Sequence, residues 1–399
     1  MAGNGQGQGR EVLRAVHYRT GEAVTVTLEN GLIGSIGKLE GISGEEAASL
    51  PIVAPGLVDL QINGYCGLDF NTLPYREELA SDFIRKLWQE GVTSSYPTVI
   101  TNSAEAIEEA MRSIADACRR DAAVEAGVAG IHLEGPFITP EDGARGAHGR
   151  AYVGPPDWEL FQRWQEAAEG RIRILTLSPE WEGSAAFISR CVDSGVVVSI
   201  GHTAATPEQI AQAVAAGARM STHLGNGSHP MLQRHPNYIW EQLAQDQLWS
   251  CIIGDGFHLP EQVLKVVMKV KGEQAILVSD AVALSGLPPG EYDTHVGGSV
   301  ILTPEGKLHL AGNDKILAGS AQMLLFGIRH LAKTGLADWR DAWEMASIRP
   351  SAFMGLPSAE GLSPGAPADL ALLRHKENGI QLVGTYKSGI KVMNREALT

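Results

Sequence analysis

Eight short apolar segments, several of them separated by stretches with the pattern of amphipathic helices, constrain the fold of this chain more than any other feature. Apolar strands that alternate with helices are typical of a parallel sheet. Eight such units fit a closed (β/α)8 TIM barrel better than the alternative, a doubly wound open sheet. Doubly wound sheets commonly bind nucleotides through a Gly-rich loop after a strand. No such loop follows any of these segments, so the sequence does not indicate a nucleotide-binding protein of that fold. The segments are 57–63, 92–100, 128–135, 172–180, 196–203, 219–226, 250–256 and 275–281.

The two ends of the chain have a different pattern from the middle. Apolar and polar residues alternate there around turns such as Asn30-Gly31, which is typical of short antiparallel strands. We predict that residues 11–54 and 360–399 pair into a small β-sandwich domain beside a barrel of residues 55–359. The first ten residues are rich in Gly and Gln, and we expect residues 1–10 to be disordered.

Composition excludes several classes of function. The chain of 399 residues has a formal net charge of −14, which argues against nucleic-acid binding and against adhesion to anionic membranes. It contains no run of 18 apolar residues and no signal-peptide pattern, so we expect no membrane association. Its four Cys show no CxxC spacing, which favours the reduced thiols of a cytoplasmic protein.

Polar side chains end most of the apolar segments. Catalytic groups of a (β/α)8 barrel lie at the C-terminal ends of its strands. A single histidine at such a place is more often a packing or capping residue, but six of the eight segments end in, or are followed by, a polar group. This repetition indicates an active site. The residues are Gln61, Asn63, His132, Glu134, His202, His223, Asp255, His258 and Asp280.

Three of these residues have the side chains of a hydrolytic metal site. Glu134, His202 and His223 follow three strands that would be near neighbours, and one carboxylate with two imidazoles is a ligand set of catalytic zinc. Such an ion would lower the pKa of a water toward about 7 and polarise a carbonyl oxygen. Asp280 would take a proton from that water and pass it to a leaving amine. A helix cap or turn residue is the alternative for Asp280.

Several motifs make the sequence similar to one family. The chain contains, in this order, "APGLVDLQINGYCGLDFN", "GIHLEGPFI", "GAHGRAYV", "SIGHTAAT", "IIGDGFHL", "LVSDA" and "LAGS". Together they resemble the N-acetylglucosamine-6-phosphate deacetylases of the amidohydrolase superfamily, from about residue 51 to 375. The resemblance implies an enzyme that hydrolyses the acetamide of a phosphorylated amino sugar to the free amine and acetate.

The resemblance also implies a single metal ion. Many amidohydrolases bind two metals through a His-x-His at the end of the first strand and a carboxylated Lys after the fourth. This chain has Gln61 and Asn63 at the first place and no Lys at the second. We therefore expect one divalent ion per subunit on Glu134, His202 and His223, zinc by default, with Fe, Mn or Co also compatible. Gln61 and Asn63 would support the ligands or hold a water.

Further roles follow from the resemblance alone. His148 matches a histidine that hydrogen-bonds the substrate carbonyl and steadies its oxyanion. Arg234 and His258 match residues that bind the sugar phosphate, partly across a dimer interface, so we expect a homodimer. A surface arginine is the alternative for Arg234. The residues that match substrate-lining segments are Asn226, Gly227, Leu317, Ala318 and Gly319.

One loop departs from the family pattern. The family reads "THLFNAM" where this chain reads "THLGNGSHPMLQRHPNYIW", with Gly227 in place of Ala and with His229 and His235 added. Because segment 224–238 should cover the sugar, N-acetylgalactosamine-6-phosphate, an unphosphorylated sugar or another N-acyl amino sugar are alternative substrates. A different amidohydrolase reaction is disfavoured by the missing His pair and Lys. A non-catalytic binding protein is disfavoured because all four predicted catalytic and metal residues are present.

Overall fold

Eight parallel strands form the centre of the molecule. The computed structural model describes residues 10–294, 298–377 and 379–395. The strands are hydrogen-bonded in the order β14-β13-β12-β11-β10-β9-β8-β5. The ring closes where the Asp280 amide donates to the Gln61 carbonyl at 2.9 Å and the Asn63 amide donates to the Ala281 carbonyl at 2.8 Å. The TIM barrel is therefore confirmed, with all eight predicted strands. They are β5 (Leu57–Ile62), β8 (Val92–Ile100), β9 (Ile131–Glu134), β10 (Ile172–Leu177), β11 (Val197–Ile200), β12 (Met220–Ser221), β13 (Trp249–Ile253) and β14 (Ala275–Val278).

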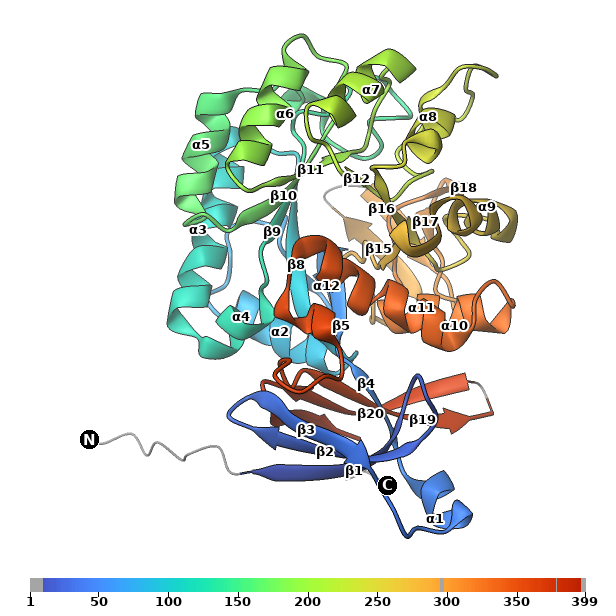
Figure 1. Ribbon diagram of the computed structural model, residues 1–399. Helices are drawn as coiled ribbons and strands as arrows, with labels where there is room; N and C mark the ends of the chain where they lie inside the picture. The colour runs from blue at the N-terminus through green and yellow to red at the C-terminus, as the bar shows by residue number, and fades with distance from the viewer. Residues whose placement is uncertain (1–9, 295–297, 378, 396–399) are drawn as a thin grey trace, which may run out of the picture.

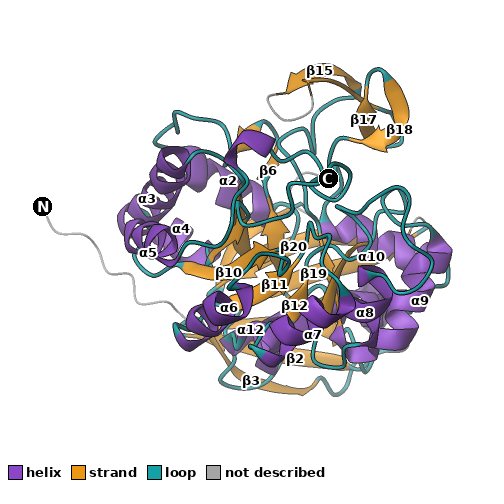
Figure 2. Ribbon diagram, turned by 90° about the horizontal axis from the view of Figure 1, so that it is seen from above, coloured by secondary structure: helices purple, strands orange, loops and turns teal. Residues whose placement is uncertain are grey.

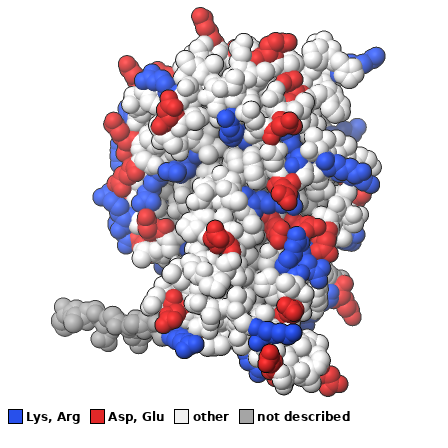
Figure 3. Space-filling model, in the orientation of Figure 1, with Lys and Arg blue, Asp and Glu red and all other residues white. Residues whose placement is uncertain are grey.

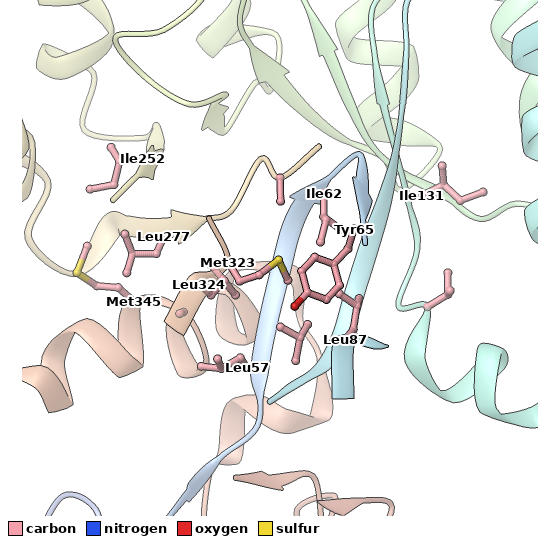
Figure 4. Close-up of a cluster of buried hydrophobic side chains, with 14 of the residues drawn as sticks. Leu57, Ile62, Tyr65, Leu87, Ile131, Ile252, Leu277, Met323, Leu324 and Met345 are labelled. Atoms are coloured by element: carbon pink, nitrogen blue, oxygen red, sulfur yellow. The ribbon is translucent and has the colours of Figure 1, made fainter. Parts of the chain in front are cut away.

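Amphipathic helices cover the outside of the barrel (Figure 1). In α3 (Ala104–Arg120) the buried residues Ile107, Met111, Ile114 and Cys118 recur every three or four positions, so they form one apolar face. Figure 4 shows part of the core between the barrel wall and its helices. The other helices that cover the barrel are α2 (Leu79–Trp88), α4 (Ala122–Gly127), α5 (Trp158–Ala167), α6 (Ser184–Asp193), α7 (Pro207–Ala215), α8 (Tyr238–Ala244), α9 (Glu261–Lys271), α10 (Leu324–Lys333) and α11 (Trp339–Met345).

The N-terminal end of the barrel is closed by apolar packing. Inside the barrel, Leu60, Tyr96 and Ile174 belong to one buried cluster. Phe353 and Met354 of α12 (Ile348–Met354) pack against this cluster, so α12 seals the barrel at that end. The opposite, C-terminal end of the strands remains open for a site.

The two ends of the chain form the expected small β domain, at the bottom of Figure 1. Hydrogen bonds join its strands into one seven-stranded sheet in the order β21-β20-β19-β4-β1-β2-β3. A buried ion pair of 2.7 Å between Lys387 and Asp369 reaches the barrel, because the Lys387 ammonium also lies 3.5 Å from the Ser94 hydroxyl. Of residues 1–10, for which we expected disorder, residues 1–9 lie outside the described residues. The strands are β1 (Glu11–His17), β2 (Ala23–Glu29), β3 (Leu32–Lys38), β4 (Ile52–Pro55), β19 (Leu370–Lys376), β20 (Gly379–Lys387) and β21 (Ile390–Asn394), with helix α1 (Gly44–Ser49) after β3.

A four-stranded antiparallel sheet lies between β14 and α10 in the sequence, and the sequence pattern did not predict it. Its inner side chains Val300, Leu302 and Leu308 pack with Val282 and Leu284, which follow β14. Viewed from above, this sheet stands at one side of the barrel mouth (Figure 2). It therefore forms part of the wall of any site there. Its strands are β15 (Gly290–Thr294), β16 (Gly298–Leu302), β17 (Leu308–Leu310) and β18 (Asn313–Leu317); a short hairpin, β6 (Gly64–Tyr65) with β7 (Leu68–Asp69), follows β5.

Charged side chains of both signs share the surface. On the face shown in Figure 3, Lys and Arg side chains are intermixed with Asp and Glu side chains. None of the helices in the described part of the chain combines the length and the hydropathy that a membrane-spanning helix needs.

Candidate active site

A cavity of about 770 Å³ opens at the C-terminal ends of the barrel strands. The structure brings together here most of the site residues that we predicted; Gln61, His132, Asp255 and Arg234 do not line the cavity. Gln61 is buried without lining the cavity, and Arg234 is exposed outside it. The predicted residues that line the cavity are Asn63, Glu134, His148, His202, His223, Asn226, Gly227, His258, Asp280, Leu317, Ala318 and Gly319.

Sharp backbone turns at the strand ends aim three of these side chains into the cavity. His202, His223 and Asp280 have φ angles of +48°, +26° and +48°, in the left-handed region that few residues other than glycine adopt. Each of these residues lies two positions beyond the end of its strand. The cluster of such residues at one end of the barrel is typical of a functional site.

Glu134, His202 and His223 converge within the cavity. The Nε2 atoms of the two histidines are 3.1 Å apart, and they lie 3.4 Å (His202) and 3.1 Å (His223) from Oε1 of Glu134. The carbonyl of Ala144 lies 3.0 Å from Nδ1 of His202 and can only accept, so Nδ1 carries the proton and Nε2 has a free lone pair. This donor set fits a divalent metal ion, with its lone pairs directed to one point.

The electrostatics of this cluster favour a positive charge. Burial alone would raise the pKa of Glu134, but the two imidazoles beside it hold that pKa well below its usual range. Burial alone would lower the pKa of His223, yet the adjacent Glu134 raises it to about 9. The carboxylate is thus ionised, which is the form that binds metal.

The amides of Gln61 and Asn63 occupy the place of the His-x-His pair. Gln61 Nε2 donates to Glu134 Oε1 at 2.8 Å, and Asn63 Nδ2 donates to Asp280 Oδ1 at 2.8 Å. Both side-chain oxygens are buried without a partner among the described residues. These two residues therefore fix the carboxylates of Glu134 and Asp280 and leave two acceptors free.

Glu180, which follows the fourth barrel strand β10, has a carboxylate that is fully engaged in hydrogen bonds to neighbouring loops. Its carboxylate accepts hydrogen bonds from Thr139 Oγ1 at 2.7 Å, Ser178 Oγ at 2.8 Å and the Ala204 amide at 2.7 Å. It thereby ties the loops after β9 and β11 together. Glu180 does not line the cavity.

Asp280 lies beside the Glu134–His202–His223 cluster. Burial raises the pKa of Asp280 to about 6, although the nearby His223 opposes the rise. A carboxyl group with this pKa can both accept and return a proton near neutral pH.

His148 lies on the loop after β9, against the same cluster. Its Nε2 is 4.0 Å from Glu134 Oε2, and its ring centre is 4.3 Å from that of His202. Its Nδ1 lies 2.8 Å from the hydroxyl of Thr101. Burial, together with the charge of His202, lowers the pKa of His148 to about 3, so the imidazole is neutral.

His258 forms a second, separate arrangement in the cavity. Its Nδ1 donates to Oδ2 of Asp255 at 2.8 Å. Burial alone would raise the pKa of Asp255, but this contact outweighs burial, and the pKa is lowered. The backbone amides of Phe257 and His258 donate to the other oxygen of Asp255. The Nε2 of His258 keeps no partner among the described residues, so it is available to a ligand.

The loop that departs from the family pattern is fixed to its neighbours. His229 lies between the Tyr238 hydroxyl, 3.0 Å from Nδ1, and Glu141 Oε2, 3.0 Å from Nε2. Gly227 has a φ of +55°, and a Cβ atom there would lie 2.6 Å from Nδ1 of His202. Alanine would therefore collide at this position. Arg234 is exposed in this loop and does not line the cavity of its own chain.

Sequence reasoning missed Thr101 and several residues of the cavity wall. Thr101 directly follows β8, so the strand-end rule that selected the other residues could have selected it. The segment after the β6–β7 hairpin and the tip of β15 gave no such signal, because polar loop residues are common everywhere. Those wall residues are Asp69, Asn71, Tyr75, Arg76, Asp293 and Thr294.

Comparison with known proteins places these features in a family. Residues 52–391 match the model of the amidohydrolase family. An N-acetylglucosamine-6-phosphate deacetylase of Bacillus subtilis (strain 168) is 31% identical over 366 residues, 87% of this chain and 89% of the relative. The enzyme of that name from Homo sapiens is 32% identical over 359 residues, 87% of this chain and 84% of the relative.

Solved structures agree with the observed architecture. An N-acetyl-D-glucosamine-6-phosphate deacetylase mutant from Mycobacterium smegmatis, in complex with N-acetyl-D-glucosamine-6-phosphate, has a TM-score of 0.84 and 27% identity. The alignment covers 97% of this chain and 100% of that one. A D-hydantoinase shares the fold, with a TM-score of 0.60 and 12% identity.

Proposed function

The chain belongs to the amidohydrolase family and to its N-acetylglucosamine-6-phosphate deacetylases, and we propose that it hydrolyses N-acetylglucosamine-6-phosphate to glucosamine-6-phosphate and acetate. The observation that carries the proposal is the convergence of Glu134, His202 and His223 beside Asp280 in one cavity. A carboxylate, two imidazoles and a separate acid–base group are what the metal-assisted hydrolysis of an amide requires.

Glu134, His202 and His223 would hold one divalent ion. Zinc suits this set of ligands, and Fe, Mn or Co are the alternatives. Such an ion, when bound, supplies Lewis acidity, which makes a water more acidic and a carbonyl carbon more electrophilic. The amides of Gln61 and Asn63 are already engaged as donors, which supports one ion rather than two.

Asp280 is the proposed proton carrier. As water attacks the acetamide carbon, the carboxylate of Asp280 accepts a proton from it. Asp280 then returns that proton to the sugar nitrogen as the C–N bond breaks, so acetate and the amine leave and the carboxylate is restored. Asn63 holds Oδ1 of Asp280 and so orients the carboxylate for both transfers.

His148 is the proposed donor to the substrate carbonyl oxygen. It is buried at the edge of the cluster, 4.0 Å from Glu134, where a bound acetamide would lie. A neutral N–H aimed at that oxygen stabilises the charge that develops on it. The free side-chain oxygen of Asn63, which lines the cavity, would accept a hydrogen bond from the attacking water.

The sugar and its phosphate would occupy the rest of the cavity. We propose that the wall formed by Asn226, Gly227 and the segment 317–319 contacts the sugar. We also propose that His258, as an imidazolium held by Asp255, donates from Nε2 to the phosphate. Arg234 would complete the phosphate site from a second copy of the chain, since it lies outside the cavity of its own chain. The proposed assembly is therefore a homodimer.

An exposed apolar surface supports the proposed homodimer. Helices α8 and α9 are in contact, and the side chains on their outer faces and on the loop before α8 are unusually exposed for their type. A second copy that covered this surface would lie next to the loop of Arg234. The residues are Met231, Leu232, Trp240, Val263, Val266 and Val270. The four free cysteines support a reducing, cytoplasmic location.

The decisive experiment is acetate release by zinc-loaded enzyme. N-acetylglucosamine-6-phosphate would be compared with unphosphorylated N-acetylglucosamine and with N-acetylgalactosamine-6-phosphate. We expect a strong preference for the first. Equal or higher activity on either comparison sugar would keep the chemistry and refute the substrate, whereas no acetate from any of them would refute the proposed reaction.

An unphosphorylated sugar is the second candidate substrate. It is favoured by the position of Arg234, because a single chain offers His258 but not this arginine to a phosphate. In the homodimer, Arg234→Ala should raise KM for the phosphorylated sugar and leave unphosphorylated N-acetylglucosamine unaffected. Sedimentation of the native enzyme as a monomer would favour the second candidate.

A further inference from the structure

We propose that Thr101 is a positioning residue that determines which nitrogen of His148 carries the proton, an inference that rests on the proposed role of His148. Thr101 directly follows β8, and its side chain is 5% exposed. It does not line the cavity, so it acts on the substrate only through His148.

The Thr101 hydroxyl has two neighbours that can accept its single proton. Its Oγ1 lies 2.8 Å from Nδ1 of His148 and 3.4 Å from the carbonyl oxygen of Glu134. A hydroxyl donates one hydrogen bond only. The contact with His148 has the usual length of such a bond, whereas the contact with the carbonyl is long. When Nδ1 of His148 is unprotonated, it is the nearer acceptor for the hydroxyl proton; the direction of this hydrogen bond then depends on where the proton of His148 lies.

The surroundings of the other nitrogen indicate where that proton lies. Nε2 of His148 lies 4.0 Å from Oε2 of Glu134, a buried carboxylate. An N–H directed toward a carboxylate is attracted, and a lone pair directed toward it is repelled. A neutral imidazole has one proton. That proton is thus on Nε2, and Nδ1 is the acceptor for Thr101.

This arrangement is the one that the reaction needs. With the proton on Nε2, His148 presents an N–H to the substrate carbonyl oxygen and stabilises its growing negative charge. If Thr101 instead donated to the Glu134 carbonyl, Nδ1 would carry the proton. Nε2 would then present a lone pair to the developing oxyanion.

The backbone leaves room for this hydroxyl. Gly135, with a φ of +84°, lies beside Thr101, and a Cβ atom at Gly135 would be 2.1 Å from the Thr101 Oγ1 atom. Any larger residue at position 135 would displace the hydroxyl from His148. The glycine and the threonine are therefore matched to each other.

Two substitutions at Thr101 separate the hydroxyl from the shape of the side chain. Thr101→Val keeps the shape and removes the donor, and Thr101→Ser keeps the donor and removes a methyl group. We expect Thr101→Val to lower kcat about tenfold to hundredfold with little change in KM, which is less than the loss of an oxyanion donor itself. Thr101→Ser should stay within about threefold of the native enzyme, and both variants should retain the native Tm and metal content.

A spectroscopic measurement tests the tautomer independently of turnover. In protein labelled with ¹⁵N-histidine, the signals of His148 are assigned by comparison with His148→Gln. We expect Nε2 protonated and Nδ1 unprotonated but hydrogen-bonded, and in Thr101→Val the Nδ1 signal should move to that of a nitrogen without a hydrogen bond. In His148→Gln, the further change Thr101→Val should cost no additional activity.

Three results would overturn the proposal: native kcat in Thr101→Val, an equal loss in Thr101→Val and Thr101→Ser, or a native His148 protonated on Nδ1. The failure of the proposed function would look different. In that case the native enzyme would release no acetate, while the ¹⁵N signals would still report the state of His148.

Discussion

Replacing Asp280 by asparagine tests the proposed proton transfers with little disturbance of the site. The amide side chain has the same shape as the carboxylate, and its oxygen can still accept the hydrogen bond that Asn63 donates to Oδ1 at 2.8 Å. Burial disfavours the charged form of Asp280, so a neutral amide there should not destabilise the fold. What Asp280→Asn removes is the ability to accept a proton.

The expected loss follows from the number of transfers. One general acid–base step contributes about 10²- to 10⁴-fold, and Asp280 is proposed to act in two consecutive steps of which one limits the rate. We therefore expect kcat to fall by about 10³- to 10⁴-fold, or about 4 to 5 kcal/mol. Acetate release with saturating substrate gives kcat, while metal analysis and thermal unfolding serve as controls. Activity within tenfold of the native enzyme, at native metal content, would refute the mechanism.

Three further perturbations have defined outcomes. Dialysis against a chelator should abolish acetate release and lower Tm, because the buried Glu134 loses a cation, and added zinc should restore both; activity that survives complete metal removal would contradict the metal site. Burial raises the pKa of Asp59 from 3.8 to about 7, so between these pH values the folded chain holds a proton that the unfolded chain releases. The free energy of unfolding should therefore decline by about 2 to 4 kcal/mol as the pH rises across this range. Urea unfolding should show Asp59→Asn gaining stability relative to the native protein between about pH 4 and pH 7. A constant difference over this range would contradict a buried, protonated Asp59. Asp369→Ala leaves Lys387 charged and buried and should lower the free energy of unfolding in urea by about 3 to 5 kcal/mol. The double variant Asp369→Ala with Lys387→Met should recover most of this loss. An equal loss in the single and the double variant would show that the unpaired charge is not the cause.

The barrel could be predicted because its signal is local. Each strand is a short apolar run, and several helices carry their own start and stop residues, as at Thr206, where a capping box begins α7. Seven of the eight predicted strands were too long at their C-terminal ends; only 92–100 ends where β8 does. His202 and His223 leave the hydrogen-bonded ladder through left-handed turns, which an apolar pattern cannot reveal.

The β15–β18 sheet could not be predicted for a different reason. Its strands are three to five residues long, and many of their side chains are exposed, so the segment has the composition of a loop. What holds it is long-range packing of residues such as Val300 on Val282. That contact is not visible in any short window of sequence.

The site was predictable in its residues but not in its hydrogen bonds. The strand-end rule and the family motifs selected Glu134, His202, His223 and Asp280, and the structure brings them together. Which atoms are engaged and which are free depends on distances of a few tenths of an ångström. Thr101 shows this, because its importance rests on one contact to a side chain from another element.

The seven-stranded sheet has a consequence for how the chain is made. Strand β4 pairs with β1 on one side and with β19 on the other, yet β4 and β19 lie near opposite ends of the sequence. During synthesis the first four strands leave the ribosome long before β19, so one edge of β4 stays unpaired while the whole barrel is translated. The small domain, whose strands begin the sequence, is therefore the last part of the molecule to be completed.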